Sequence, residues 1–218
     1  MGIKYSAYTQ FFIGSYTGAG FTISAFSNAN PGVATLSAAH GIVANDLMSL
    51  KSGWSRFNDR IFRASAVASN DVTVEGANSS DTSVFAVGSG IGSGKEVNSA
   101  GWTEITQVLD DWAPSGGDLQ WGELQYAASD IGIRYPRKRN PITFSLPYAY
   151  DAALPWLATL RAATDAAAAL PFLIRYQDGS KAYANAVFSL RDLPQPRDGA
   201  LVDTIDLSLM ARPVVYTS

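Results

Sequence analysis

The segment Leu170-Pro-Phe-Leu-Ile-Arg-Tyr-Gln-Asp-Gly179 decides the fold class of this 218-residue chain. Apolar residues recur in it at every second position, at Leu170, Phe172, Ile174 and Tyr176. This period is that of a strand with one buried face, and Asp178-Gly179 then predicts the turn of a β-hairpin. The returning strand carries apolar side chains at the same spacing: Ala184, Ala186, Phe188 and Leu190. The pattern predicts an antiparallel sheet with one buried and one solvated face.

Two other segments of the second half, residues 142–148 and 201–209, have the same period of two. Their inward-facing residues are Ile142, Phe144, Leu146, Tyr148, Leu201, Ile205, Leu207 and Leu209. Polar residues stand between them, at Thr143, Ser145, Thr204, Asp206 and Ser208. We therefore expect a sheet of about six strands in this half of the chain.

Only one segment has the period of a helix, from about residue 151 to residue 169. Its apolar residues form one stripe at 3.6-residue spacing: Ala153, Trp156, Leu157, Leu160, Ala163 and Ala167. We expect Trp156, Leu157 and Leu160 to pack on the sheet. The predicted fold class is α+β, mainly β, an antiparallel sandwich or barrel with one packed helix and a small inserted β subdomain.

The inserted subdomain is predicted from two glycine-rich segments, residues 14–20 and 88–94, which have the composition of flexible linkers. Short strand-like runs lie between them, at residues 33–37, 47–51, 60–67, 72–75 and 83–87. We expect residues 21–87 to form a small β subdomain, inserted into a host domain made of residues 1–20 and 88–218. The alternative is a single N-terminal half with two glycine-rich loops.

Composition excludes several classes of function. Charged residues make up 16% of the chain, which contains no cysteine and only one histidine, His40. Disulfide scaffolds, thiolate metal sites, multi-histidine metal sites and histidine triads are therefore excluded, and we predict no metal or cofactor. The net charge of −3 argues against a dedicated nucleic-acid binder. The longest apolar run, residues 166–174, is too short for a membrane helix.

Three groups of residues are candidates for catalysis or modification. His40 could act as a general base, but a hydrogen bond that stabilises a turn is the favoured interpretation. The carboxylates Asp110, Asp111, Asp118 and Glu123 could form an acid–base pair for glycoside hydrolysis, but solvated charges on a loop are favoured. Residues 1–8 lack the apolar stretch of a signal peptide, although Gly2 and Ser6 fit a myristoylation pattern. We predict that the protein is not an enzyme.

A surface for assembly is the remaining hypothesis. Residues 103–126 are predicted to form a long hairpin, with Asp110, Asp111 and Trp112 at its loop. A basic arm follows, made of Arg134, Arg137, Lys138 and Arg139. Trp is frequent at interface hot spots, and the arm carries the charge opposite to that of the two aspartates. We expect these seven residues to make contacts between subunits or between stacked rings.

The order of several motifs resembles that of the major tail tube proteins of long, non-contractile-tailed bacteriophages. The matching motifs are Trp102-Thr-Glu-Ile-Thr-Gln-Val108, Ser115-Gly-Gly117, Arg137-Lys-Arg-Asn-Pro-Ile-Thr-Phe-Ser-Leu146, a helix that starts near Tyr150-Asp151, Phe172-Leu-Ile-Arg-Tyr-Gln-Asp-Gly179 and residues 184–189. Residues 29–62 also resemble a small β module common in phage proteins. Usual members of that module have Gly-Asp where this chain has Asn45-Asp46.

The resemblance implies a structural virion protein that forms rings, six subunits in each, stacked into a hollow tube. Its partners would be other copies of itself, a tape-measure protein and tail-end proteins. DNA would pass through without specific binding, no membrane would be involved, and assembly would take place in the cytoplasm of the bacterial host. The alternative is a carbohydrate-binding, adhesin or decoration β-domain of a virion, with exposed aromatic residues as sugar platforms.

Overall fold

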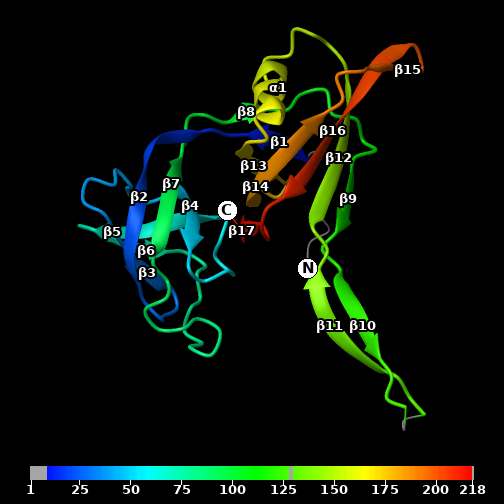
Figure 1. The fold of residues 1–218 in the computed structure, drawn as a ribbon. Coiled ribbons are helices and arrows are strands. Elements are labelled where there is room, and N and C mark those ends of the chain that lie inside the picture. The colour runs from blue at the N-terminus through cyan, green and yellow to red at the C-terminus, as the bar shows by residue number, and fades with distance from the viewer. Residues whose placement is uncertain (1–8, 128–129, 218) are drawn as a thin grey trace.

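A computed structural model describes residues 9–127 and 130–217 of the chain. Residues 1–8, with the possible myristoylation pattern, lie outside the described residues. The chain forms a closed barrel, a large antiparallel sheet with one helix, and a hairpin that extends away from the sheet (Figure 1). The predicted fold class, mainly β with one helix, is confirmed.

The large sheet has nine strands, all paired antiparallel. Seven lie in the order β8 (Thr103–Glu104), β1 (Gln10–Ile13), β13 (Ala169–Arg175), β14 (Lys181–Leu190), β16 (Ala200–Leu209), β12 (Ile142–Ala149) and β9 (Ala113–Gly116). Two short strands extend it, β15 (Gln195–Arg197) on β16 and β17 (Val214–Tyr216) on β14. The hairpin predicted at Asp178-Gly179 joins β13 to β14, with Phe172 opposite Ala184.

The helix α1 (Leu157–Asp165) is shorter than predicted at both ends. Before it, the Asp151 carboxylate accepts a hydrogen bond from the Ala153 amide at 2.9 Å, which holds this segment in a turn. After it, Ala167 has a φ of 47°, which ends the helical conformation, and Ala169 begins β13. Trp156, Leu157 and Leu160 are buried, and Leu160 is 0% exposed.

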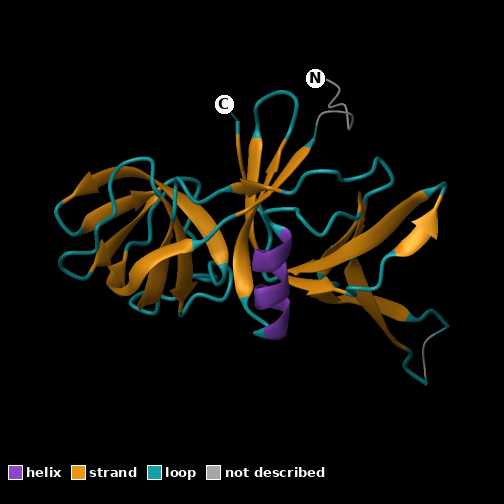
Figure 2. Cartoon of the chain, turned by 90° about the horizontal axis from the view of Figure 1, so that it is seen from above, coloured by secondary structure: helices purple, strands orange, loops and turns teal. Residues whose placement is uncertain are grey.

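The barrel is closed by six strands in the order β2 (Tyr16–Phe26), β3 (Gly32–Leu36), β6 (Asp71–Val74), β5 (Arg60–Ala68), β4 (Leu47–Ser52) and β7 (Gly92–Val97). Its core contains an aromatic cluster in which the Phe57 and Phe85 rings lie 4.9 Å apart. Figure 2 shows the barrel on one side of α1 and the extended hairpin on the other. On β13, Leu173 belongs to the barrel core and Phe172 to the core that contains α1, so this strand is buried on both faces and the prediction of one solvated face is wrong here.

Parts of both glycine-rich segments are strand, which corrects their prediction as flexible linkers. Residues 16–20 belong to β2 and residues 92–94 to β7, and these two strands pair with each other in the barrel, whereas residues 14–15 and 88–91 lie outside strands. A Cβ on Gly94 would lie 2.5 Å from the Phe21 ring, so glycine is needed for this ring to cover β7. Residues 83–87, predicted as a strand, form a turn because the Asp81 carboxylate accepts hydrogen bonds from the Ser83 amide and hydroxyl.

The boundaries of the inserted subdomain stay a prediction, and the ends of the barrel strands are the positions at which to test them. The barrel strands run from Tyr16 to Val97, wider than residues 21–87. Directly outside them, the Asn98 amide donates a hydrogen bond to the Ser15 carbonyl at 2.9 Å. The two connections to the barrel therefore lie side by side.

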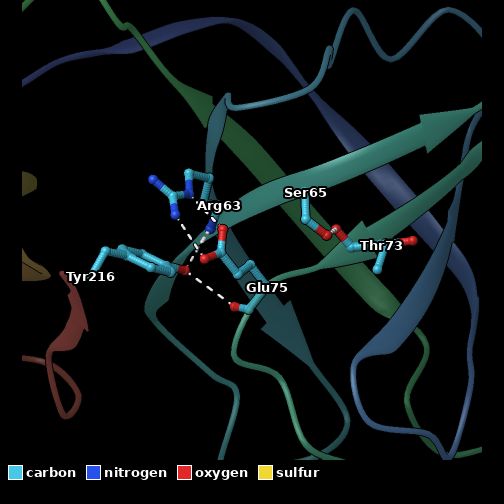
Figure 3. Close-up of polar contacts among 5 residues, drawn as sticks. All are labelled: Arg63, Ser65, Thr73, Glu75 and Tyr216. Atoms are coloured by element: carbon cyan, nitrogen blue, oxygen red, sulfur yellow. Dashed lines mark hydrogen bonds and ion pairs between the residues drawn. The ribbon is translucent and has the colours of Figure 1, made fainter. Parts of the chain in front are cut away.

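The C-terminal strand joins the barrel to the sheet through Tyr216. Its hydroxyl accepts a hydrogen bond from the Arg63 amide at 2.8 Å and donates one to the Glu75 carbonyl at 3.2 Å (Figure 3). The Arg63 guanidinium lies 4.5 Å from the Tyr216 ring and forms a two-pronged ion pair with the Glu75 carboxylate. Burial raises the pKa of Tyr216 to about 12, so this phenol stays protonated and able to donate.

Candidate assembly surface

The extended hairpin consists of β10 (Leu119–Leu124) and β11 (Ile133–Arg139), which pair only with each other among the described residues. This corrects the predicted hairpin of residues 103–126. Thr103–Glu104 is instead β8, paired with β1, and Ala113–Gly116 is β9, paired with β12. The basic segment, predicted as a loop or arm, is β11 itself.

The hairpin continues the edge of the large sheet, because β9 leads into β10 and β11 leads into β12. Gly116 and Gly117 have φ values of 79° and 78°, which turn the chain between β9 and β10. Hydrogen bonds continue across this bend, from the Gly117 amide to the Asn140 carbonyl at 3.2 Å and from the Asn140 amide to the Asp118 carbonyl at 2.9 Å. The hairpin is therefore held in a direction set by the sheet, and Figure 1 shows it projecting from the body.

One face of the hairpin is apolar. Leu124 pairs with Ile133 and Gly122 with Tyr135, and residues directly opposite each other share a face. Leu124, Ile133 and Tyr135 are 46%, 52% and 43% exposed. A Cβ on Gly122 would lie 2.5 Å from the Tyr135 ring, so the glycine allows that ring to cover the strand. We call Gly122, Leu124, Ile133 and Tyr135 the apolar face of the hairpin.

The other face carries charge. Glu123 and Arg134 lie opposite each other and form an ion pair at 3.3 Å, and the Arg134 guanidinium lies 5.8 Å from the ring of Trp121. All three side chains are exposed. Exposed pairs of this kind contribute only about 0–1 kcal/mol, so this face adds little to the stability of the hairpin.

A two-stranded hairpin with both faces in solvent is marginally stable by itself. Here both outer edges also offer unpaired backbone groups among the described residues. The large sheet fixes the direction of this strand pair, one face of the pair is apolar, and its edges are unpaired. These features are typical of a surface that binds another protein molecule.

The other residues predicted for assembly lie in two separate places. Arg134, Arg137, Lys138 and Arg139 are all exposed on β11, and Arg139 donates to the Gly117 carbonyl at 3.0 Å. Asp110 and Asp111 lie between β8 and β9, where Asp111 forms an ion pair with Arg197 at 2.7 Å. This hydrogen bond from Arg197 lowers the pKa of Asp111. Within one chain, Asp111 thus pairs with Arg197, not with the basic strand.

Trp112 packs within its own chain. It is half-buried, with its ring 5.2 Å from that of Phe11 and 6.4 Å from that of Phe144. Its role in a subunit contact stays a prediction, but replacing it would also disturb the core. The apolar face of the hairpin, which the sequence analysis missed, offers more accessible surface. The alternation of Ile133, Tyr135 and Arg134 could have indicated it.

His40, the candidate general base, makes two hydrogen bonds to backbone groups of the barrel. His40 accepts a hydrogen bond from the Ile42 amide at 3.0 Å and donates to the Ser69 carbonyl at 3.1 Å, so it links two turns of the barrel. Residues 9–127 and 130–217 contain no group of three His, Cys, Asp or Glu side chains placed to hold a metal ion. No helix in these residues is long and apolar enough to cross a membrane.

Comparison with known proteins agrees with the earlier resemblance. The family model "Phage tail tube protein, TTP" matches residues 52–218, which is more than half of the chain. The match includes the large sheet from β8 onward, the helix and the whole extended hairpin. No match to a curated protein was found. The chain belongs to the phage tail tube protein family.

Proposed function

We propose that this protein forms rings, six subunits in each, that stack into the tube of a long, non-contractile phage tail. The observation that carries the proposal is the β10–β11 hairpin, with its exposed apolar face and a direction set by the sheet. Family membership supports the structural role in the virion. The ring number and the tail type rest on the resemblance.

The edges of the large sheet support closure into a ring. Its edge strands are β8, with two residues, and β9, with four. Unpaired strand edges invite pairing with another chain, and a head-to-tail contact forms a ring when the rotation between copies closes. In this proposal, the ring contact covers the sheet edges and the hairpin reaches a further copy.

The partners of the tube are other copies of the chain, a tape-measure protein and tail-end proteins. Assembly takes place in the cytoplasm of the bacterial host, and DNA later passes through the tube without specific binding. The net charge of −3 supports passage of this kind, because nucleic acid is held mainly by cationic surfaces. The chain acts through shape and contact, not through catalysis.

Electron microscopy of the purified full chain tests the proposal. We expect hollow tubes of uniform diameter, built from rings, above a threshold protein concentration. A protein that stays monomeric at every concentration and binds glycans on an array would contradict the proposal and favour the carbohydrate-binding alternative.

We further propose that the barrel is a peripheral module that the sheet does not need in order to fold. Replacing residues 16–97 by a short Gly-Ser linker should leave a folded chain that still forms tubes. The reason is that Ser15 and Asn98 are already hydrogen-bonded neighbours and that most of the barrel core is formed by the barrel itself. Circular dichroism, urea unfolding and microscopy measure the result.

The excision exposes apolar residues of the sheet that the barrel covers, including Val214 and Tyr216. A matched version should therefore also carry Val214→Thr and Tyr216→Ser, so that aggregation is not mistaken for misfolding. If neither version folds, the barrel is part of one common core and the proposed boundaries are wrong.

A further inference from the structure

A cavity of about 830 Å³ lies where the barrel, the base of the hairpin and the segment after β16 meet. Four arginines from three segments line it: Arg56, Arg60, Arg139 and Arg212. Two carboxylates also line it, those of Asp59 and Asp81. We call these six residues the basic cavity. In a chain with net charge −3, such a local excess of cations calls for an explanation.

The four arginines have few acidic partners within the described part of the chain, although the pKa of the Asp81 carboxylate, lowered mainly by hydrogen bonds from Ser83, is lowered further by the charge of Arg56. None of them forms an ion pair there. Asp59 lies 4.0 Å from Lys51, and the Asp81 carboxylate already accepts hydrogen bonds from Ser83. The two carboxylates of the cavity are therefore partly committed to other groups.

Arg60 is the least satisfied member of the basic cavity. Its Nε atom is buried and has no hydrogen-bond partner among the described residues. Its guanidinium lies over the Phe62 ring, 4.9 Å from the centroid. Burial lowers the pKa of Arg60, and the charge of Arg212 lowers it further. An anion in the cavity would offset both of these costs, since hydrogen bonds from arginine to a carboxylate are among the strong ones in proteins.

A surface of opposite charge lies at the other end of the same strands. There, Asp110, Asp111 and Asp198 line a hollow of about 400 Å³ together with the guanidinium of Arg197. Asp110 and Asp198 form no ion pair with a described residue. We call these four residues the acidic hollow.

The acidic hollow cannot fill the basic cavity of its own chain. Ala200 and Val202, at the start of β16, line the hollow, whereas Met210 and Arg212, just beyond its end, line the cavity. Residues 203–209 of β16 lie between Val202 and Met210, which corresponds to roughly 25 Å. In Figure 1, β15 lies at the top of the view, and the base of the β10–β11 hairpin, which borders the cavity, lies well below it.

We propose that the basic cavity binds the carboxylates of the acidic hollow of a second copy of this chain, in a head-to-tail contact. Because the cavity and the hollow are different surfaces at opposite ends, each copy can bind one neighbour at each end, and the contact repeats along a stack. This contact rests on the proposed tube, in which it would fix the head-to-tail orientation of neighbouring subunits.

Charge-swapped chains test the proposal. The cavity variant carries Arg56→Glu and Arg212→Glu, both at exposed positions, and leaves the half-buried Arg60 in place. The hollow variant carries Asp110→Lys and Asp198→Asn. Asparagine is used at 198 because this residue has a φ of 50°, which Asn tolerates well. A third chain carries all four substitutions.

We expect either variant alone to need a protein concentration at least about tenfold above the parent's to form tubes, because each places like charges in contact. The two variants mixed in equal amounts, and the chain with all four substitutions, should assemble at close to the parent's concentration. The control is Lys181→Glu with Asp165→Lys, two exposed charges outside both sites, which should behave as the parent does. Circular dichroism verifies that every chain is folded.

Each other outcome has a separate meaning. If the parent forms no tubes, the proposed function itself fails. If the parent and both variants assemble alike, the tube stands and the charge contact is refuted. If the variants fail alone and also fail as a mixture, the acidic hollow is not the partner of the cavity. Calorimetric titration with inorganic phosphate identifies the remaining case: phosphate binding by the parent that the cavity variant loses would overturn the proposal in favour of a phosphate site.

Discussion

Leu124→Thr combined with Ile133→Thr is expected to prevent tube formation at concentrations where the parent assembles. Both side chains are about half exposed and directly opposite each other on the apolar face of the hairpin. Central apolar anchors of an interface each contribute about 2 kcal/mol or more, so losing two should raise the threshold concentration by roughly a thousandfold. Threonine keeps the preference for a strand, which preserves the hairpin itself.

Light scattering against protein concentration, with microscopy of the same samples, measures this threshold. The matched control is Glu123→Gln with Arg134→Gln on the other face, which removes one exposed ion pair and should change the threshold only slightly. Urea unfolding should be the same for all three proteins. If the apolar variant assembles as well as the parent, the hairpin face is not the contact.

Leu160→Ala is expected to lower the free energy of unfolding by about 2–5 kcal/mol, the largest stability change we predict for a single substitution. Leu160 is 0% exposed and belongs to the core that α1 forms with β14 and its neighbours. The loss has two parts. One is the transfer free energy of the removed carbon atoms, and the other is the cost of the cavity that remains because the sheet does not move to fill it. Urea unfolding followed by circular dichroism measures it.

Thr159→Ala on the exposed side of the same helix serves as the control and should change stability by no more than about 0.5 kcal/mol. It also separates packing from helix propensity, because both substitutions introduce alanine. A loss below about 0.5 kcal/mol for Leu160→Ala would show that the helix does not contribute to the core as the structure indicates.

The local pattern of apolar residues is sufficient to predict an element where residues that are neighbours in the sequence are also neighbours in space. The β13–β14 hairpin follows from its period of two and from Asp178-Gly179, since the turn itself fixes the register. The buried stripe of α1 follows from the spacing of Trp156, Leu157 and Leu160. The ends of this helix do not follow from that spacing, because a side-chain hydrogen bond of Asp151 and the backbone of Ala167 set them.

The same pattern is insufficient to predict which strands pair when the two strands are far apart in the sequence. Leu119–Leu124 has the composition of a strand, but nothing in it shows that it pairs with Ile133–Arg139. The prediction joined it to residues 103–109 because they are close in sequence. In the structure, β8 instead pairs with β1, ninety residues earlier in the chain. For the same reason, residues 16–20 and 92–94, which look like linkers in the sequence, are barrel strands because each segment has the other as a partner.

The sequence by itself determined that this chain is mainly β, that it has one amphipathic helix and that it contains no cysteine and a single histidine. These properties depend on local period and composition. Only the tertiary structure decided that the apolar residues of the hairpin are exposed and that four arginines from distant segments line one cavity. Exposure and the meeting of distant charges depend on which strands pair, and strand pairing is settled by the packing of the whole chain.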